Sequence, residues 1–390
     1  MRRISDDIYY IGVDDVNSPL FENQYPVPEG MAMNSYVIID DKVAVLDTTD
    51  EHLIDPWEAN LKEALQGRDI DYLVVHHMEP DHSAAAYRLL QQHEKMKVVA
   101  TQKAIQLFTQ FFPQADLTDR TIIVKEGDTL PLGKHSLRFF TAPMVHWPEV
   151  MVSYEQKEKI LFSADAFGKF GALSKTGFTD QEDTDWACEA RRYYFNICGK
   201  YGAPVQTLLK KAATLDLSLI CPLHGPMLGQ TINDCVALYN TWSRYEAEKH
   251  GVLIAHASAH GGTAKAAEML ARMLREKGEE VSVIDLCHED VSYAVEDAFM
   301  FDRVVLAASS YDAALFPPMH DLIYHLQIKA WQNKRVALIE NGSWAPSAAR
   351  VMREMLGSMK NIDIIEPQIT IKSRLNDTTI AELTELSKII

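Results

Sequence analysis

The segment HHMEPDH, residues 76–82, places three histidines and two carboxylates in seven positions, directly after the apolar run YLVV. Imidazole and carboxylate groups are side chains that bind transition metals. If a strand ends near His76, the four polar side chains that follow lie on a loop and at the start of a helix, where they can converge. These four are His77, Glu79, Asp81 and His82. The spacing therefore predicts a metal site at the end of a strand.

Three further candidates occupy similar places in the chain, each after an apolar strand and before a turn. They are His146, Asp165 and His224. Taken singly, a histidine at a strand end is usually a satisfied or exposed residue, and the SAD motif at Asp165 could be a helix N-cap. Four potential ligands in six residues, joined by three at spaced strand ends, favour a metal site over these separate explanations.

A second set of loops lies in the last third of the chain. The loop HASAHGGTAKAAEML follows a strand and opens a helix, so its backbone N–H groups could bind an anion, although GGT before a helix is also an ordinary turn. Two more loops, AASSYDAALFP and ENGSWAPSAAR, follow apolar strands in the same way. No G-x-G-x-x-G fingerprint is present, which argues against direct use of NAD(P)H.

The elements that must position these residues divide the chain in two. Short strand patterns alternate with helical ones up to about residue 245, which predicts an α/β sandwich with the strands inside. After Gly251 a regular alternation of strand, loop and helix is typical of a doubly wound parallel sheet. We predict domains at 1–248 and 249–390, each large enough for its own core.

Composition excludes several classes of protein. The formal charge of −17, from 38 basic and 55 acidic residues, disfavours attraction to nucleic acid or anionic membrane. The N-terminus lacks the apolar region and cleavage site of a secretory signal, and no apolar run is long enough to span a bilayer. Five scattered cysteines without a C-x-x-C pair indicate free thiols in a reducing compartment. We expect a cytoplasmic protein with no nucleic-acid or membrane partner.

The ligand segment resembles that of the metallo-β-lactamase fold, whose loop reads His-x-His-x-Asp-His. Glu79 stands where hydrolases of that fold have the second histidine. Replacing an imidazole by a carboxylate makes the site harder and more negative, which favours iron over zinc. His-x-Glu-x-Asp-His is similar to the pattern of flavodiiron proteins, the oxygen and nitric oxide reductases built on this fold. The likeness covers essentially the whole chain and implies a metallo-β-lactamase-like αββα sandwich followed by a flavodoxin-like domain.

The resemblance also implies roles for individual residues. One iron would be held by His77, Glu79 and His146, and the other by Asp81, His82 and His224, with Asp165 bridging. Tyr194 is implied as a residue beside the diiron site or as a proton donor, and Trp147 and Tyr25 are further candidates near the irons or the flavin. Three carboxylates on two Fe²⁺ ions leave about one positive charge, which moderates the cost of oxidation.

In the flavodoxin-like part, the resemblance implies that the three loops bind FMN. The implied residues are Ser258, His260, Gly261, Gly262, Thr263, Ser310, Tyr311, Asp312, Ala313, Gly342, Ser343, Trp344 and Ala345. Two positions depart from the family pattern: His260 stands where an aromatic residue is usual, and Trp344-Ala345-Pro346 replaces the more frequent Tyr/Phe-Gly-Trp. Trp344 or Tyr311 could still stack on the flavin ring.

The activity implied by the likeness is the reduction of O₂ to water, of NO to N₂O, or of both, with electrons passed through FMN. The donor would be a separate rubredoxin-like protein, since this chain has no C-x-x-C pair, and the likeness implies a head-to-tail homodimer or a dimer of dimers. Two alternatives stay open. One is a binuclear zinc hydrolase fused to a flavodoxin-like regulatory domain, and the other is an electron-carrying flavoprotein with a structural metal domain. The choice between O₂ and NO also stays open.

Overall fold

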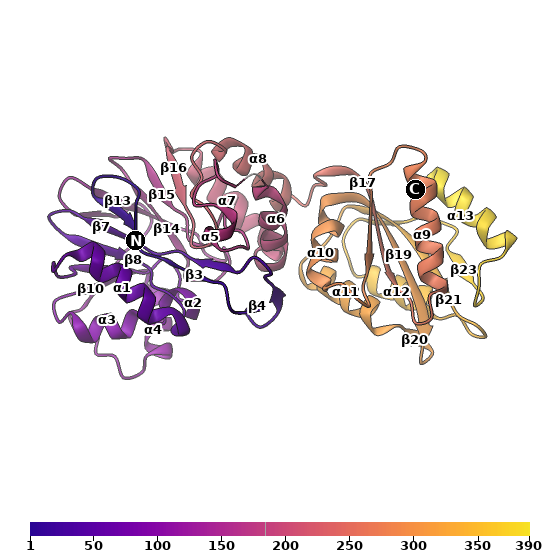
Figure 1. Cartoon of the computed structure of the whole chain (residues 1–390), viewed down its shortest axis with the longest axis horizontal. Helices are drawn as coiled ribbons and strands as arrows, with labels where there is room; N and C mark the ends of the chain where they lie inside the picture. Colours follow the sequence, from indigo (N-terminus) through magenta and orange to yellow (C-terminus); the bar gives the residue numbers. More distant parts are fainter. Residues whose placement is uncertain (184) are drawn as a thin grey trace. The chain divides into compact units, whose positions relative to one another are not determined.

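The computed structural model describes residues 1–183 and 185–390, which form two compact units (Figure 1). The N-terminal unit comprises Met1–Tyr194 and Ala203–Tyr239. The C-terminal unit comprises Phe195–Gly202 and Asn240–Ile390. The predicted domain boundary between residues 248 and 249 stays a prediction.

Two sheets form the centre of the N-terminal unit. The larger has the strand order β1-β2-β7-β8-β9-β10-β11, and its bounds are Arg2–Arg3, Ile8–Tyr10, Tyr36–Ile39, Val43–Leu46, Tyr72–Val74, Lys97–Ala100 and Thr121–Ile123. The smaller has the order β12-β13-β14-β15-β16, with bounds Thr129–Pro131, Ser136–Thr141, Met151–Glu155, Ile160–Phe162 and Leu219–Cys221. Strands β8 to β11 run parallel, as do β15 and β16.

Neighbouring residues of the larger sheet belong to different cores, because successive side chains of a strand point to opposite faces. Leu73 packs in a cluster with Trp57 of α1 (Ile54–Leu65) and Phe108 of α4 (Gln102–Phe111) on the outer face. Val74 packs in the cluster between the sheets with Phe139 of β13. The predicted sandwich with internal strands is confirmed.

Further helices and two small ribbons surround these sheets. The helices are α2 (Pro80–Ser83), α3 (Ala86–Gln92), α5 (Leu173–Thr176), α6 (Trp186–Ile197), α7 (Gly202–Ala212) and α8 (Ile232–Ser243), of which α6 and α8 end in residues of the C-terminal unit. The single turn η1 (Glu51–Leu53) precedes α1, and η2 (Gly199–Tyr201), which precedes α7, belongs to the C-terminal unit. Two small antiparallel ribbons pair β3 (Val13–Asp15) with β6 (Met31–Met33) and β4 (Leu20–Phe21) with β5 (Tyr25–Pro26).

The C-terminal unit contains a parallel sheet with the order β18-β17-β19-β21-β22. In that order, the bounds are Val281–Asp285, Lys249–Ala257, Phe301–Tyr311, Lys334–Asn341 and Ile362–Ile364. Because the chain adds β18 on one side of β17 and then β19 on the other, the strand order reverses at β17. Doubly wound sheets bind ligands at such a switch point, beyond the carboxyl ends of the strands. Two short strands, β20 (Ala314–Leu315) and β23 (Ile369–Ile371), pair with β19 and β21.

Helices cover both faces of this parallel sheet (Figure 1). Residues of α9 (Gly262–Arg275) and α13 (Asp377–Ile389) share one core cluster with Ile254 and Val305 of the sheet. The other helices are α10 (Val291–Met300), α11 (Pro317–Ile328) and α12 (Ala348–Leu356). The predicted doubly wound architecture is confirmed.

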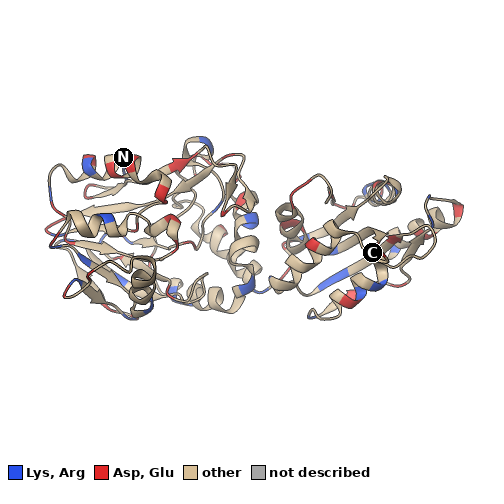
Figure 2. Ribbon diagram, turned by 90° about the horizontal axis from the view of Figure 1, so that it is seen from below, with Lys and Arg blue, Asp and Glu red and all other residues tan. Residues whose placement is uncertain are grey.

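Charged residues are dispersed over helices and loops of both units (Figure 2). Within residues 1–183 and 185–390, there is no helix whose length and apolar character would allow it to cross a membrane.

Candidate metal centre and flavin loops

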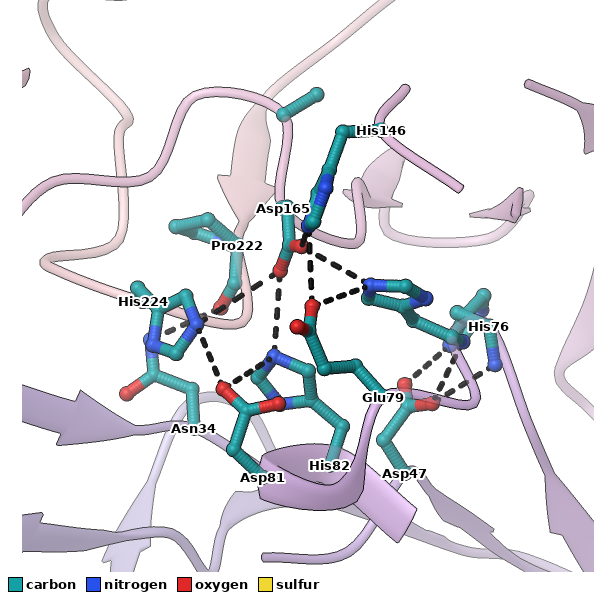
Figure 3. A network of polar contacts seen from close by, with 12 residues as sticks. Asn34, Asp47, His76, Glu79, Asp81, His82, His146, Asp165, Pro222 and His224 are labelled. Carbon is teal, nitrogen blue, oxygen red and sulfur yellow. Dashed lines mark hydrogen bonds and ion pairs between the residues drawn. The ribbon is translucent and has the colours of Figure 1, made fainter. Parts of the chain in front are cut away.

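The seven predicted metal ligands come together in the N-terminal unit. Figure 3 labels Glu79, Asp81, His82, His146, Asp165 and His224. The seven ligands follow the ends of four strands: His77 and Glu79 after β9, with Asp81 and His82 in the short helix α2 that comes next, His146 after β13, Asp165 after β15, and His224 after β16. Pro80 opens α2, so the ligand segment turns from the strand directly into that helix.

Four of these residues form the first ligand group, here group A: His77, Glu79, His146 and Asp165. Glu79 Oε2 lies 3.0 Å from Nε2 of His77 and 3.0 Å from Nε2 of His146. Asp165 Oδ2 lies 3.3 Å and 3.1 Å from the same two nitrogens. Two imidazole nitrogens and two carboxylate oxygens therefore face a common point.

The other three residues form group B: Asp81, His82 and His224. Nε2 of His82 lies 3.2 Å from Asp81 Oδ2 and 3.2 Å from Asp165 Oδ1. Nε2 of His224 lies 3.3 Å from Asp81 Oδ2 and 3.8 Å from Asp165 Oδ1. Asp165 thus presents Oδ2 to group A and Oδ1 to group B, and Figure 3 shows it between the two.

The residues of both groups fit metal ions. Both carboxylate oxygens of Asp81, both ring nitrogens of His82 and Oδ1 of Asp165 are buried, and none forms a hydrogen bond with the described part of the chain. Buried polar atoms without partners are costly and require an explanation. Ligand atoms around an octahedral ion at about 2.1 Å lie about 3.0 Å apart. Except for the 3.8 Å between His224 and Asp165, the spacings given above are 3.0–3.3 Å, so a cation would satisfy these atoms.

The charges of the site perturb its pKa values strongly. Burial by itself lowers the pKa of His146, but hydrogen bonds to Asp165 and Glu79 outweigh burial and raise that pKa to about 9. Burial likewise opposes protonation of His77, yet Asp165 and other carboxylates raise the pKa of His77 well above its usual range. Burial alone would raise the pKa of Asp165, but the surrounding imidazoles hold it well below its usual value. Protons on these imidazoles occupy positions that a cation can take.

Two acidic residues that the sequence reasoning missed hold the ligand segment in place. Asp47, after β8, accepts the backbone N–H of His76 at 2.7 Å, and its other oxygen lies 2.6 Å from Nδ1 of His76. Nε2 of His76 lies 2.7 Å from Oγ of Ser153 on β14. Glu149 accepts a hydrogen bond from Nδ1 of His77 at 2.7 Å. The only signal in the sequence is that Asp47 follows the apolar run VAVL and that Glu149 follows shortly after His146.

A cavity of about 510 Å³ adjoins the metal groups and reaches Glu79 and Asp81. Its other walls come largely from the β3–β6 and β4–β5 ribbons, which supply Asp15, Ser18, Leu20, Phe21, Glu22, Asn23, Val27, Met31 and Met33, with Asp50 and His52 beside them. The ring of Phe21 lies edge-on to His224, with centroids 5.2 Å apart. Burial and the nearby charge of Glu79 raise the pKa of Glu22 to about 8.

Aromatic side chains surround the ligands. Trp147 lies edge-on to His77, with ring centroids 5.2 Å apart, so this predicted neighbour is at the site. The ring of Tyr193 lies 5.6 Å from that of His224, whereas Tyr194 packs against Tyr239 at 5.0 Å. Tyr193 was not predicted, and the proposed role of Tyr194 stays a prediction. Tyr25 packs against Phe170, which in turn contacts Phe21.

The predicted flavin residues lie on three loops at the carboxyl ends of β17, β19 and β21, which are neighbours in the parallel sheet. Ser258 to Thr263 follow β17 and begin α9. Ser310 and Tyr311 end β19, Asp312 and Ala313 follow it, and Gly342 to Ala345 follow β21. The three loops therefore lie side by side at the switch point of the sheet.

Contacts within these loops fit a bound phosphate and ring. Oγ of Ser258 is buried and makes no hydrogen bond with any residue that the structure describes. A Cβ on Gly262 would lie 2.8 Å from the carbonyl oxygen of Ser373, so this position requires glycine. Trp344 is 92% exposed and Tyr311 is 48% exposed, so both aromatic rings are available to a ligand.

Comparison with known proteins agrees with this architecture. Residues 31–225 match the family model described as "ODP family beta lactamase", and this range is half of the chain and contains all seven ligands. The fold and the site define a metallo-β-lactamase-like protein that carries a flavodoxin-like unit.

Two relatives and two solved structures extend the match to nearly the whole chain. A nitric oxide reductase of Moorella thermoacetica is 29% identical and covers 95% of this chain and 92% of its own. A rubredoxin-oxygen oxidoreductase of Megalodesulfovibrio gigas is 27% identical, and the match covers 92% of this chain and 89% of that protein. The rubredoxin oxygen:oxidoreductase structure from Desulfovibrio gigas has a TM-score of 0.92 at 25% identity, covering 99% of this chain and 96% of its own. The flavodiiron protein structure from Giardia intestinalis shares the fold, with a TM-score of 0.93 at 22% identity and the same coverage. The chain belongs to the flavodiiron proteins and is an oxidoreductase.

Proposed function

We propose that this protein reduces O₂ to water, NO to N₂O, or both, at a non-haem diiron centre that receives electrons through FMN. The single observation that carries the proposal is Asp165, which presents one carboxylate oxygen to each of two adjoining ligand groups. A shared carboxylate of this kind suits two metal ions held close together. The activities for which the relatives are named, nitric oxide reductase and rubredoxin-oxygen oxidoreductase, support the reaction class.

The ligand types favour iron over zinc. Group A would hold one ion through His77, Glu79 and His146, and group B would hold the other through Asp81, His82 and His224, with Asp165 shared. Mixed imidazole and carboxylate ligands suit iron, and Glu79 adds negative charge where a histidine would suit zinc. When bound, a pair of ferrous ions supplies electrons to a small diatomic substrate.

The protein around the ligands controls what reaches them. The cavity next to Glu79 and Asp81 offers access, and its wall of carboxylates disfavours anionic ligands. Phe21 packs edge-on against His224 and Trp147 edge-on against His77, which limits the room for water beside these two rings. A neutral diatomic molecule passes through a cavity lined by acidic and apolar side chains more readily than an anionic substrate does.

The C-terminal unit would hold FMN at its three loops. Ser258, Gly262 and Thr263 would bind the phosphate, because the loop offers an unpaired hydroxyl, a close backbone approach and a helix N-terminus. Tyr311 and Trp344 would contact the ring. We also propose a separate rubredoxin-like electron donor and a homo-oligomeric, head-to-tail arrangement, supported by the family and by the absence of a C-x-x-C pair in the sequence.

Metal and flavin analysis of the protein purified under anaerobic conditions, followed by O₂ and NO consumption with a reduced rubredoxin, tests this function. We expect about two irons and one FMN per chain, with consumption of at least one gas. Asp165→Ala should abolish gas consumption, because both ligand groups lose an oxygen. The matched control is Asp216→Ala, which removes an exposed carboxylate paired with Lys159 in the same unit.

Zinc in place of iron, no bound flavin and no gas consumption would contradict the proposal and favour the binuclear zinc hydrolase. Gas consumption that survives Asp165→Ala would instead support a flavoprotein whose metal domain is structural. The ratio of O₂ to NO turnover by the same preparation assigns the preferred substrate.

A further inference from the structure

Glu149 lies directly behind one metal ligand and is completely buried. Its Oε1 accepts hydrogen bonds from Nδ1 of His77 at 2.7 Å and from the backbone N–H of Met78 at 2.9 Å. The backbone carbonyl of Glu149 accepts a hydrogen bond from Oγ1 of Thr101, the N-cap residue of α4. Since a carboxylate only accepts, His77 keeps a proton on Nδ1, and Nε2, which faces Glu79 and Asp165, is the nitrogen that would bind a metal ion.

The histidines of group B have no comparable support. Nδ1 of His224 donates to the uncharged backbone carbonyl of Ala32 at 2.7 Å. Neither ring nitrogen of His82 forms a hydrogen bond within residues 1–183 and 185–390. Hydrogen bonds to an ionised group are about twice as strong as those between neutral groups. A carboxylate partner also fixes the ring orientation of a ligating histidine and raises its basicity.

The negative charge is likewise uneven between the groups. Group A contains Glu79 and has Glu149 behind it, whereas group B contains Asp81 alone, and Asp165 is shared. A cation in group A is therefore close to three carboxylates, and a cation in group B is close to two.

We propose that Glu149 is a positioning residue that makes group A the tighter metal position, so that group A fills before group B. This inference rests on the proposed function, in which both groups hold iron. It adds an order of loading and the residue that sets it. Binding at group A would also orient Asp165, whose Oδ1 faces group B.

The test is an anaerobic titration of the metal-free, full-length protein with Co²⁺, followed by visible absorption and calorimetry. The wild type should show two separate binding events. The tighter event should disappear in His146→Ala, which removes a ligand of group A, and persist in His224→Ala, which removes a ligand of group B. Glu149→Gln should weaken the tighter event about 10- to 100-fold, because the amide still accepts a hydrogen bond but carries no charge.

Glu155→Gln is the matched control. Glu155 is also completely buried, and its Oε1 lies 3.0 Å from Nδ1 of His135, which belongs to neither ligand group. Both variants should lower the melting temperature of the metal-free protein, but Glu155→Gln should leave both Co²⁺ affinities unchanged. The comparison separates loss of a buried charge from loss of support for a ligand.

The outcomes distinguish this inference from the proposed function. Absence of any Co²⁺ binding to the wild type contradicts the proposed function itself. Two results would overturn the loading order alone. One is that the wild type shows two binding events but Glu149→Gln leaves the Co²⁺ affinity of the tighter event unchanged. The other is that the tighter event survives in His146→Ala. If Glu149→Gln does not fold, the two histidine variants still decide which group fills first.

Discussion

Oδ2 of Asp47 lies 2.6 Å from Nδ1 of His76, and Oδ1 of the same carboxylate accepts the backbone N–H groups of His76 and His77 at 2.7 Å and 3.3 Å. Both side chains are 1% exposed. One buried carboxylate therefore holds the ring of His76 and the backbone that leads into the ligand segment. Because His76 also contacts Ser153 of β14, this arrangement links the two sheets of the sandwich.

Asp47→Ala should destabilise the N-terminal unit by about 3 kcal/mol or more, since each buried donor left without a partner costs about 1–3 kcal/mol. It should also reduce bound metal, because the start of the ligand segment is no longer held. Thermal unfolding and metal analysis measure the two effects. Ser153→Ala, which removes only the far contact of His76, should cost less and leave the metal content intact. Equal effects of the two variants would contradict this role of Asp47.

Glu79→His should shift the metal preference of the site from iron towards zinc. The change restores the ligand pattern of hydrolases of this fold and removes a carboxylate oxygen that lies 3.0 Å from both His77 and His146. Competition between Fe²⁺ and Zn²⁺ for the metal-free protein, read by metal analysis, measures the shift. Glu158→His, at a half-buried position outside both ligand groups, is the control. An unchanged iron-to-zinc ratio in Glu79→His would show that Glu79 does not set metal choice.

Metal affinity should rise with pH up to about 9. Without a cation, His146 has a pKa raised to about 9, so it is protonated at neutral pH and must lose that proton to bind metal. The affinity should therefore fall as pH decreases below 9, by up to about tenfold per pH unit for each proton displaced. Co²⁺ titrations between pH 6 and 9 measure this slope. The slope of the tighter event should stay unchanged in His93→Ala, and an affinity independent of pH would contradict the protonation of the site.

Ser258→Ala should weaken FMN binding by about 10- to 100-fold, since a hydrogen bond to a charged group contributes about 1.5–3 kcal/mol. The same change should barely alter the stability of the flavin-free protein, because this hydroxyl makes no hydrogen bond to the part of the chain that is described. Flavin fluorescence titration and thermal unfolding test the two statements. Ser282→Ala should leave FMN affinity unchanged but lower the stability of the flavin-free protein, because Oγ of Ser282 donates a hydrogen bond to Asp297 away from the three loops. Similar FMN affinity in both variants would remove Ser258 from the phosphate site.

That the seven candidate ligands would lie together could be predicted, because they follow the ends of apolar strands, and the carboxyl ends of strands gather at one edge of a sandwich. Glu149 and Asp47 could not be predicted in the same way. Glu149 lies 72 residues from its partner His77, and Asp47 lies 29 residues from its partner His76. A single acidic residue after a strand is also common on protein surfaces. Tyr193 and Tyr194 are adjacent in α6, so which ring meets His224 depends on the rotation of the helix, which local pattern does not determine.

The two-part organisation of the chain could be predicted from the change of pattern near Gly251. The contribution of residues 195–202 to the C-terminal unit could not, because it depends on tertiary contacts rather than on a local signal. Likewise, the β4–β5 ribbon that lines the cavity consists of two strands of two residues each, which is too short to produce a periodic pattern.

Residues 195–202 limit how far the rest of the C-terminal unit can be treated as an exchangeable module. The ring of Phe195 stacks on Phe299 with centroids 4.1 Å apart, and Lys329 donates a hydrogen bond to the carbonyl of Asn196. A transplanted fragment that began at residue 249 would expose the ring of Phe299 and leave the buried ammonium of Lys329 without this acceptor. Recombination between family members would therefore have to exchange residues 195–202 together with the rest of the C-terminal unit, although Ala203–Tyr239 of the N-terminal unit separates the two in sequence.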